Sequence, residues 1–267
     1  MNFSRALCDL GWVRRRGLKV LVLLSFSIQR YWLDPIKPLT SDMETSSEKI
    51  SGKWYDTGSE STSWLEVFAV VATGLLYFVS KCFKARSVFI ITAVCFWSVF
   101  VYYCAHNDSS VMGEWGFRGK NFARCFLRAT LLAVPILVAM AGFTASRGRL
   151  TFPAHAWILL ALYPIWGIIQ QFLVQALVVR NVARSTLALS PATIVLIGAT
   201  VFAMAHLSNL RLLIATFGLG LVFVPLYLRY RNLWSLGLYH GWLGTFFYFW
   251  VLHRDPWSKL LAGIPFR

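Results

Sequence analysis

The sequence predicts an all-α protein, a polytopic bundle of seven or eight transmembrane helices. Its 267 residues are 57% hydrophobic and only 14% charged, whereas soluble domains carry about 25% charged residues. The charged residues gather between apolar runs that are close to the ~20 residues needed to cross a bilayer. These runs do not alternate with period two, as the strands of a transmembrane barrel do. Helices are therefore expected, because lipid offers no partners for backbone N–H and C=O groups.

Eight apolar runs are candidate spans. The first, 17–29, has a basic flank and also reads like a signal peptide. Because no small-residue cleavage site of the Ala-x-Ala type follows it, an uncleaved anchor or an interfacial helix is favoured. The other seven runs are 64–80, 87–104, 128–146, 155–179, 190–206, 211–228 and 233–252. Aromatic side chains lie near several of their ends, as expected at membrane–water interfaces.

We expect the chain to have three parts. Residues 1–63 hold a basic segment, the possible first anchor and a polar external loop. Residues 64–150 hold three transmembrane helices, and 151–267 hold a core with polar motifs. A basic stretch before the first run predicts a cytoplasmic N-terminus in the cell membrane. The basic residues at 180–184 and 229–231 would then lie outside, so either one span is re-entrant or the first segment does not cross.

The formal net charge of +15 does not predict a nucleic-acid partner. In a membrane protein, basic residues flank spans and contact anionic lipid head groups. The chain has no RNA-binding signature and no zinc-finger spacing. Its five cysteines are scattered without a C-x-x-C pair, which favours small apolar fillers.

Polar side chains deep in three of the last four spans are the candidate functional residues. Such groups cost free energy at membrane depth unless they find partners. Gln171 and Gln175 are four residues apart and so share a helix face. Gly237 and Gly241 let a neighbouring backbone approach closely beside His240. The pattern predicts one interior cavity where amides and imidazoles meet, although each side chain alone also has a structural explanation as a helix-bridging or core group.

The order and spacing of these residues resemble the CPBP family of intramembrane proteases, also called the CAAX protease and bacteriocin-processing family, or Abi. It includes CAAX prenyl endopeptidases and proteins like lysostaphin resistance protein A. The family pattern is E-E-x-x-x-R, F-x-x-x-H and H-x-x-x-N/D on separate helices. The second motif is intact, from Phe202 to His206. The third keeps His240, but Gly244 takes the Asn or Asp position, with Thr245 next to it.

The first motif departs from the family pattern in all three of its defining positions. Gln170 and Gln171 replace the two glutamates, and Gln175 replaces the arginine. A charge at the centre of a membrane helix costs roughly 2.5–3.5 kcal/mol or more, so losing both signs together leaves a neutral hydrogen-bonding motif. The resemblance covers roughly residues 155–252.

The resemblance implies hydrolysis of a peptide bond in a membrane-associated peptide or protein. In the family a glutamate and the histidines are thought to activate a water, and the third motif helps to hold the oxyanion. The implied catalytic residues are His206, His240, Gln170 and Gln171; the implied substrate-binding or structural residues are Gln175, Phe202, Gly241 and Thr245. A divalent metal such as zinc is a further implication of the family, with unknown ligands.

An amide cannot act as a general base, so a histidine must do so here if peptides are hydrolysed. Two histidines without a carboxylate also provide few ligands for a catalytic zinc. Three hypotheses follow: an active endopeptidase, an inactive relative that serves as a membrane binding or maturation factor, and a small transporter. Against the transporter, the chain has no paired repeats with broken helices.

Overall fold

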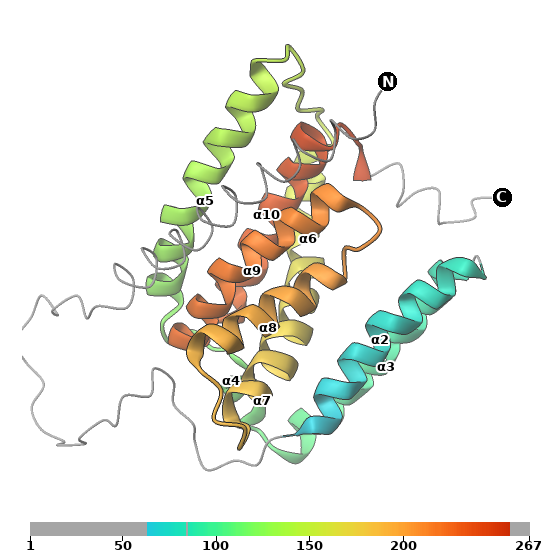
Figure 1. Ribbon diagram of the computed structural model, residues 1–267, viewed down its shortest axis with the longest axis vertical. Helices are drawn as coiled ribbons and strands as arrows, with labels where there is room; N and C mark the ends of the chain where they lie inside the picture. Colours follow the sequence, from blue (N-terminus) through green and yellow to red (C-terminus); the bar gives the residue numbers. More distant parts are fainter. Residues whose placement is uncertain (1–62, 84, 257–267) are drawn as a thin grey trace, which may run out of the picture. The chain divides into compact units, whose positions relative to one another are not determined.

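The computed structural model describes residues 63–83 and 85–256, and their regular structure is helical throughout (Figure 1). The elements are α2 (Trp64–Cys82), α3 (Arg86–Asn107), α4 (Val111–Trp115), α5 (Phe122–Ala145), α6 (Ala156–Gln171), the π-helix η1 (Phe172–Val179), α7 (Arg180–Arg184), α8 (Pro191–Met204), α9 (Leu210–Tyr230), α10 (Leu233–Phe246) and the π-helix η2 (Phe247–Val251). The predicted all-α class is confirmed over these residues. The first candidate span, 17–29, lies outside them.

Four helical stretches of the described residues are long and apolar enough to cross a membrane. They are Arg86–Asn107, Phe122–Ala145, Ala156–Arg184 and Leu210–Tyr230. The third stretch, Ala156–Arg184, consists of α6, η1 and α7, which follow one another without an intervening loop. On α3 only Trp97 is buried, which suits a helix that faces lipid. The chain is therefore an integral, multi-pass membrane protein, while the count of seven or eight crossings stays a prediction.

Helix α8 is shorter than the predicted span 190–206. It begins at a capped end, where Ser190 accepts a hydrogen bond from the backbone of Thr193 and Pro191 follows at the first helical position. Its 14 residues extend about 21 Å at 1.5 Å per residue, less than the ~30 Å hydrocarbon core. His206 therefore lies in the turn between α8 and α9, and not at the end of a full crossing.

Helices α6 and α10 pack with their backbones in direct contact. A Cβ at Gly241 would lie 2.4 Å from the backbone nitrogen of Pro164, and one at Gly237 would lie 2.7 Å from Cα of Ile168. From the other helix, a Cβ at Gly167 would lie 2.4 Å from the carbonyl oxygen of Gly237. The close approach predicted from the glycine spacing beside His240 is thus confirmed. It holds the end of α6 against the middle of α10.

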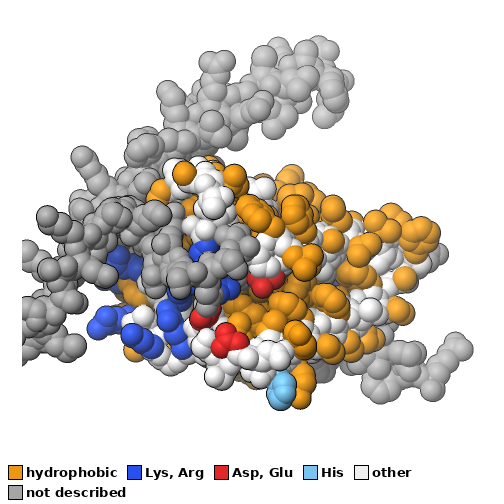
Figure 2. All heavy atoms as spheres, turned by 90° about the horizontal axis from the view of Figure 1, so that it is seen from below, with side chains coloured by type: hydrophobic (Ala, Val, Ile, Leu, Met, Phe, Trp, Pro, Cys, Tyr) orange, Lys and Arg blue, Asp and Glu red, His pale blue; other side chains and the backbone are white. Residues whose placement is uncertain are grey.

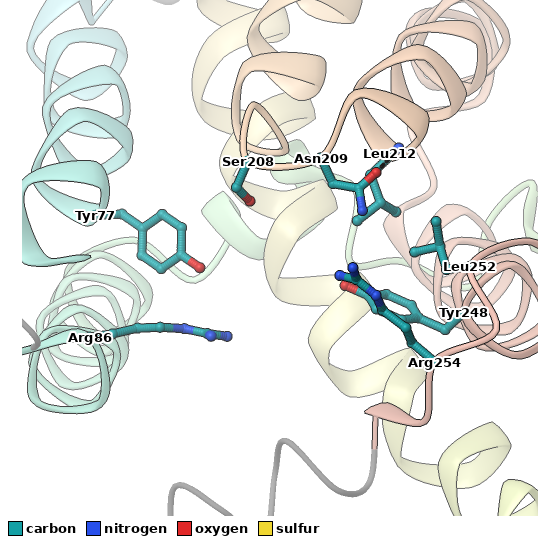
Figure 3. Close-up of a pocket in the computed structure, with 8 residues that line it drawn as sticks. All are labelled: Tyr77, Arg86, Ser208, Asn209, Leu212, Tyr248, Leu252 and Arg254. Carbon is teal, nitrogen blue, oxygen red and sulfur yellow. Dashed lines mark hydrogen bonds between the residues drawn. The ribbon is translucent and has the colours of Figure 1, made fainter. Parts of the chain in front are cut away.

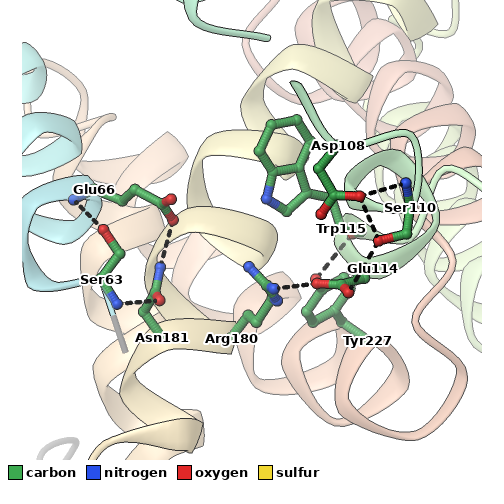
Figure 4. Close-up of polar contacts among 9 residues, drawn as sticks. All are labelled: Ser63, Glu66, Asp108, Ser110, Glu114, Trp115, Arg180, Asn181 and Tyr227. Atoms are coloured by element: carbon green, nitrogen blue, oxygen red, sulfur yellow. Dashed lines mark hydrogen bonds and ion pairs between the residues drawn. The ribbon is translucent and has the colours of Figure 1, made fainter. Parts of the chain in front are cut away.

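A polar network joins α2 and α4 to the start of α7 (Figure 4). The Arg180 guanidinium donates to Glu114 Oε2 at 2.7 Å, and the pair is largely buried. The Asn181 amide donates to Glu66 Oε2 at 2.7 Å and accepts from the backbone N–H of Ser63 at 2.9 Å. These contacts attach the α2–α3 hairpin to the helices that carry the polar motifs.

Basic side chains gather at the same end of the helices. Arg118 Nε donates to the carbonyl oxygen of Arg231, and the Asn232 amide donates to the carbonyl of Arg118 at 2.8 Å. Figure 2 shows Lys and Arg side chains next to acidic ones at this end, beside a broad hydrophobic surface. The two basic stretches at 180–184 and 229–231 therefore share one end of the helices, as a common side of the membrane requires.

We predict that Gly241→Ala destabilises the protein by about 1–3 kcal/mol, the usual cost of overpacking a tight contact. The added methyl group meets backbone atoms of α6, which cannot rotate away. Thermal unfolding followed by circular dichroism in one detergent measures the effect. Gly218→Ala in α9 is the matched control, since its Cβ meets nothing within 4 Å. Equal losses in both variants would contradict the proposed importance of this contact.

Candidate functional site

Two amides and an imidazole form a buried hydrogen-bonded chain between α6, η1 and α10. Gln175 Nε2 donates to Gln171 Oε1 at 3.0 Å, and Gln171 Nε2 lies 3.1 Å from His240 Nδ1. Both glutamine side chains are fully buried, and His240 is 8% exposed. The structure therefore brings together Gln171 and Gln175 on one face, as their spacing predicts, and places Gln171 against the histidine of the third motif.

The π-helix η1 begins directly after Gln171. A π-helical turn makes i→i+5 hydrogen bonds, is rare and is frequent at functional sites. Here the backbone N–H of Arg180 donates to the carbonyl oxygen of Gln175, five residues earlier. Gln175 Oε1 is buried and has no hydrogen-bond partner among the described residues. A buried unpaired acceptor costs about 1–3 kcal/mol, so this oxygen is suited to bind a water or a ligand group.

Phe202 lies between the two histidines of the site. Its ring centroid is 5.6 Å from that of His206 and 5.0 Å from that of His240, with edge-to-face geometry in both pairs. The Phe202 ring is 1% exposed. Both imidazoles therefore contact one buried aromatic ring, although they come from a turn and from a helix 34 residues further along the chain.

The hydrogen-bond partners give the two imidazoles opposite polarity. His206 Nδ1 lies 3.1 Å from the carbonyl oxygen of Phe202, which can only accept, so Nδ1 carries the proton and Nε2 keeps its lone pair. At His240 the direction is reversed. The side-chain oxygen of Gln171 accepts from Gln175, so the nitrogen of the Gln171 amide faces His240 Nδ1 and donates to it. Because Nδ1 of His240 accepts this hydrogen bond, the proton of the neutral His240 ring lies on Nε2. One ring thus presents an acceptor and the other a donor.

The remaining predicted site residues lie outside this chain of hydrogen bonds. Gln170 is half-buried, and its side chain forms no hydrogen bond within the described residues. The Thr245 hydroxyl is fully buried and donates to the carbonyl oxygen of Gly241 in its own helix at 3.0 Å. Thr245 therefore does not replace the hydrogen-bonding group that is missing at Gly244, which faces the ring of Tyr163.

A small cavity next to the His206 turn was not predicted from the sequence (Figure 3). Its volume is about 120 Å³. The lining residues are Tyr77, Arg86, Ser208, Asn209, Leu212, Tyr248, Leu252 and Arg254. They come from four separate segments, so no local motif marks them. The one available signal was Asn209, whose place before an apolar run is typical of a helix cap.

The residues of the site do not fit a catalytic zinc. Such sites use three protein ligands, commonly His with a carboxylate or Cys. Within the described residues, no group of three or more His, Cys, Asp or Glu side chains is placed to hold a metal. His240 Nδ1 is also occupied by Gln171. Two imidazoles and two mutually bonded amides are instead suited to hydrogen bonding and proton transfer.

Residues 151–246 match one protein family, described as type II CAAX prenyl endopeptidase Rce1-like. The matched region runs from just before α6 to the end of α10 and contains every candidate site residue. No curated protein and no solved structure matches the chain.

We predict that Gln171→Leu lowers the free energy of unfolding by at least about 1–3 kcal/mol, the cost of one buried polar group left without its partner. The change removes the partner of both His240 Nδ1 and Gln175 Nε2. Denaturant unfolding in a fixed detergent measures it. Gln170→Leu is the matched control. The side chain of Gln170 is half-buried and takes no part in the hydrogen bonds that join Gln175, Gln171 and His240. A larger loss in the control would contradict this assignment.

Proposed function

We propose that the chain is a membrane-embedded endopeptidase, because residues 151–246 match the family described as type II CAAX prenyl endopeptidase Rce1-like. Its substrate class is a membrane-associated protein that ends in a prenylated C-a-a-X motif. The bond cleaved is a peptide bond of that C-terminal segment, which the prenyl group holds at the membrane.

The opposite polarity of the two imidazoles is the observation that supports this proposal best. His206 Nε2 has a free lone pair and accepts a proton as a water attacks the substrate carbonyl. His240 Nε2–H donates a hydrogen bond to the carbonyl oxygen as negative charge develops there. The protonated His206 then delivers its proton to the leaving amine as the C–N bond breaks. Water is consumed and two peptides are released.

The amides act on this reaction through the second histidine. Gln175 orients Gln171, and Gln171 holds the proton of His240 on Nε2. Gln171 and Gln175 are therefore positioning residues in this mechanism, and Gln170 has no defined part in it. All members of the buried chain are neutral, which avoids the cost of roughly 2.5–3.5 kcal/mol for a charge at membrane depth.

An inactive relative is the alternative, and the first motif is what favours it. Neither Gln170 nor Gln171 can accept a proton near neutral pH, so the site lacks the usual carboxylate base. In that case the chain would bind a membrane-associated peptide and assist its maturation without cleaving it.

We also infer that the chain crosses the cell membrane seven or eight times. Each of the seven apolar runs after residue 63 contains a helix, and α10 with η2 extends over Leu233–Val251. The shorter apolar helices among the described residues are Trp64–Ser80 and Pro191–Met204, the second of which is α8.

We predict that His206→Ala and His240→Ala each lower kcat/KM for peptide cleavage by about 10²–10⁴-fold, the usual contribution of a general base or acid. Purified protein in liposomes is given a reporter that ends in a farnesylated cysteine and three further residues. Mass spectrometry of the products identifies the bond broken. His106→Ala is the control, because His106 is exposed at the end of α3 and stacks on Tyr102.

Three results decide between the candidates. Cleavage that survives both histidine substitutions would overturn the mechanism. A wild-type protein that binds the reporter without cleaving it would identify the inactive relative. Loss of cleavage in His106→Ala as well would indicate general instability of the histidine variants, and folding by size exclusion chromatography is therefore measured for each.

A further inference from the structure

Among the residues that the structure describes, the cavity beside the His206 turn is lined by two arginines and no acidic residue. Arg86 lies at the start of α3, and Arg254 lies in the segment after η2, so they reach the cavity from different parts of the chain (Figure 3). Within the described residues neither guanidinium takes part in an ion pair, and the neighbouring Asp255 is paired with His155 at 2.8 Å. The cavity therefore holds two positive charges for which the described part of the chain supplies no anion.

The other polar groups of the cavity also favour an anion. Asn209 Oδ1 accepts from the backbone N–H groups of Arg211 and Leu212 at 3.0 and 3.3 Å, where it caps α9. Because the oxygen is occupied, the amide nitrogen of Asn209 remains as a donor on the cavity side (Figure 3). Ser208 adds a hydroxyl. Arginines and neutral donors without a carboxylate are the usual surroundings of a bound carboxylate.

The cavity is lined by the residues that follow His206 in the same turn, Ser208 and Asn209. The backbone N–H of Asn209 donates to the carbonyl oxygen of His206 at 3.1 Å. Tyr248 follows His240 by eight residues along α10 and η2, which is about 12 Å at 1.5 Å per residue. The ring of Tyr248 contacts that of Tyr163, at 6.3 Å between centroids. Three extended peptide residues span about 10–11 Å, which matches this separation.

We propose that this cavity binds the C-terminal carboxylate of the substrate peptide. Arg86 and Arg254 pair with the carboxylate oxygens, and Asn209 donates a third hydrogen bond. The inference rests on the proposed function, because it assumes that the peptide lies with its scissile bond at His206 and His240. It adds a reason for specificity: only a peptide that ends about three residues after the scissile bond can reach the arginines.

The test measures binding, so that it does not depend on cleavage. The probe is a fluorescent peptide with farnesylated cysteine followed by Val-Ile-Met, in which a ketomethylene group replaces the peptide bond after the cysteine. It is made with a free C-terminal carboxylate and with a C-terminal amide. Both forms are titrated against the full chain in nanodiscs of phosphatidylcholine. We expect the carboxylate form to bind about tenfold more tightly, the effect of one charge-assisted hydrogen-bonded pair.

Substitutions then assign the effect to the cavity. Arg86→Gln and Arg254→Gln should each remove most of the preference for the carboxylate, because both side chains line the cavity. Arg147→Gln is the matched control. Arg147 is also an exposed arginine, but it lies over the ring of Phe143 after α5 and does not line the cavity. The control should keep the preference of the wild type.

The outcomes separate this inference from the proposed function. Equal binding of the two peptides to the wild type overturns the carboxylate site, even if the ordinary peptide is cleaved. A clear preference without cleavage of the ordinary peptide keeps the carboxylate site and removes the protease assignment. A third outcome also overturns the inference. If nanodiscs of phosphatidylglycerol abolish the preference for the carboxylate peptide, and the arginine variants retain less of this lipid than the wild type, the cavity binds a lipid phosphate.

Discussion

The backbone contact between α6 and α10 sets the position of Gln171 relative to His240 in the candidate site. Glycines on both helices allow the two backbones to approach closely. At this distance a Cβ atom in place of a glycine hydrogen would collide with the opposite helix. The contact brings the end of α6 beside His240, so that the Gln171 amide reaches its Nδ1. Close backbone packing matters more in a membrane than in water, because helix association in lipid depends on close packing and on hydrogen bonds between helices.

Neutrality is the second property that runs through the site. A chain of amides can be buried at low cost when each donor and acceptor finds a partner, whereas a lone carboxylate or guanidinium cannot. Gln171 satisfies this condition fully, and Gln175 satisfies it except at one oxygen. The buried chain thereby transmits a fixed direction of hydrogen bonding to His240. Its effect on chemistry is to decide which ring nitrogen carries the proton.

Charge is instead concentrated where helices end. One end carries the Arg180–Glu114 pair and the basic stretches around Arg118 and Arg231. The cavity lined by Arg86 and Arg254 lies beyond the turn that carries His206. A peptide whose reactive bond lies among neutral groups and whose terminus lies among arginines would be oriented by this difference. Electrostatics then orients the peptide, while hydrogen bonds at the neutral site act on the bond itself.

By itself the sequence determined the helical class, the positions of the apolar runs and the common face of Gln171 and Gln175. These properties follow from composition and from periodicity along one segment, which are local. Packing between segments decided the contact of Gln171 with His240, the separation of Gln170 from these hydrogen bonds, and the meeting of Arg86 with Arg254 in one cavity. Helix α8 ends at Met204, earlier than predicted, so His206 lies in a turn. Hydrogen-bond direction and cavity lining depend on residues far apart in the chain, so no local pattern encodes them.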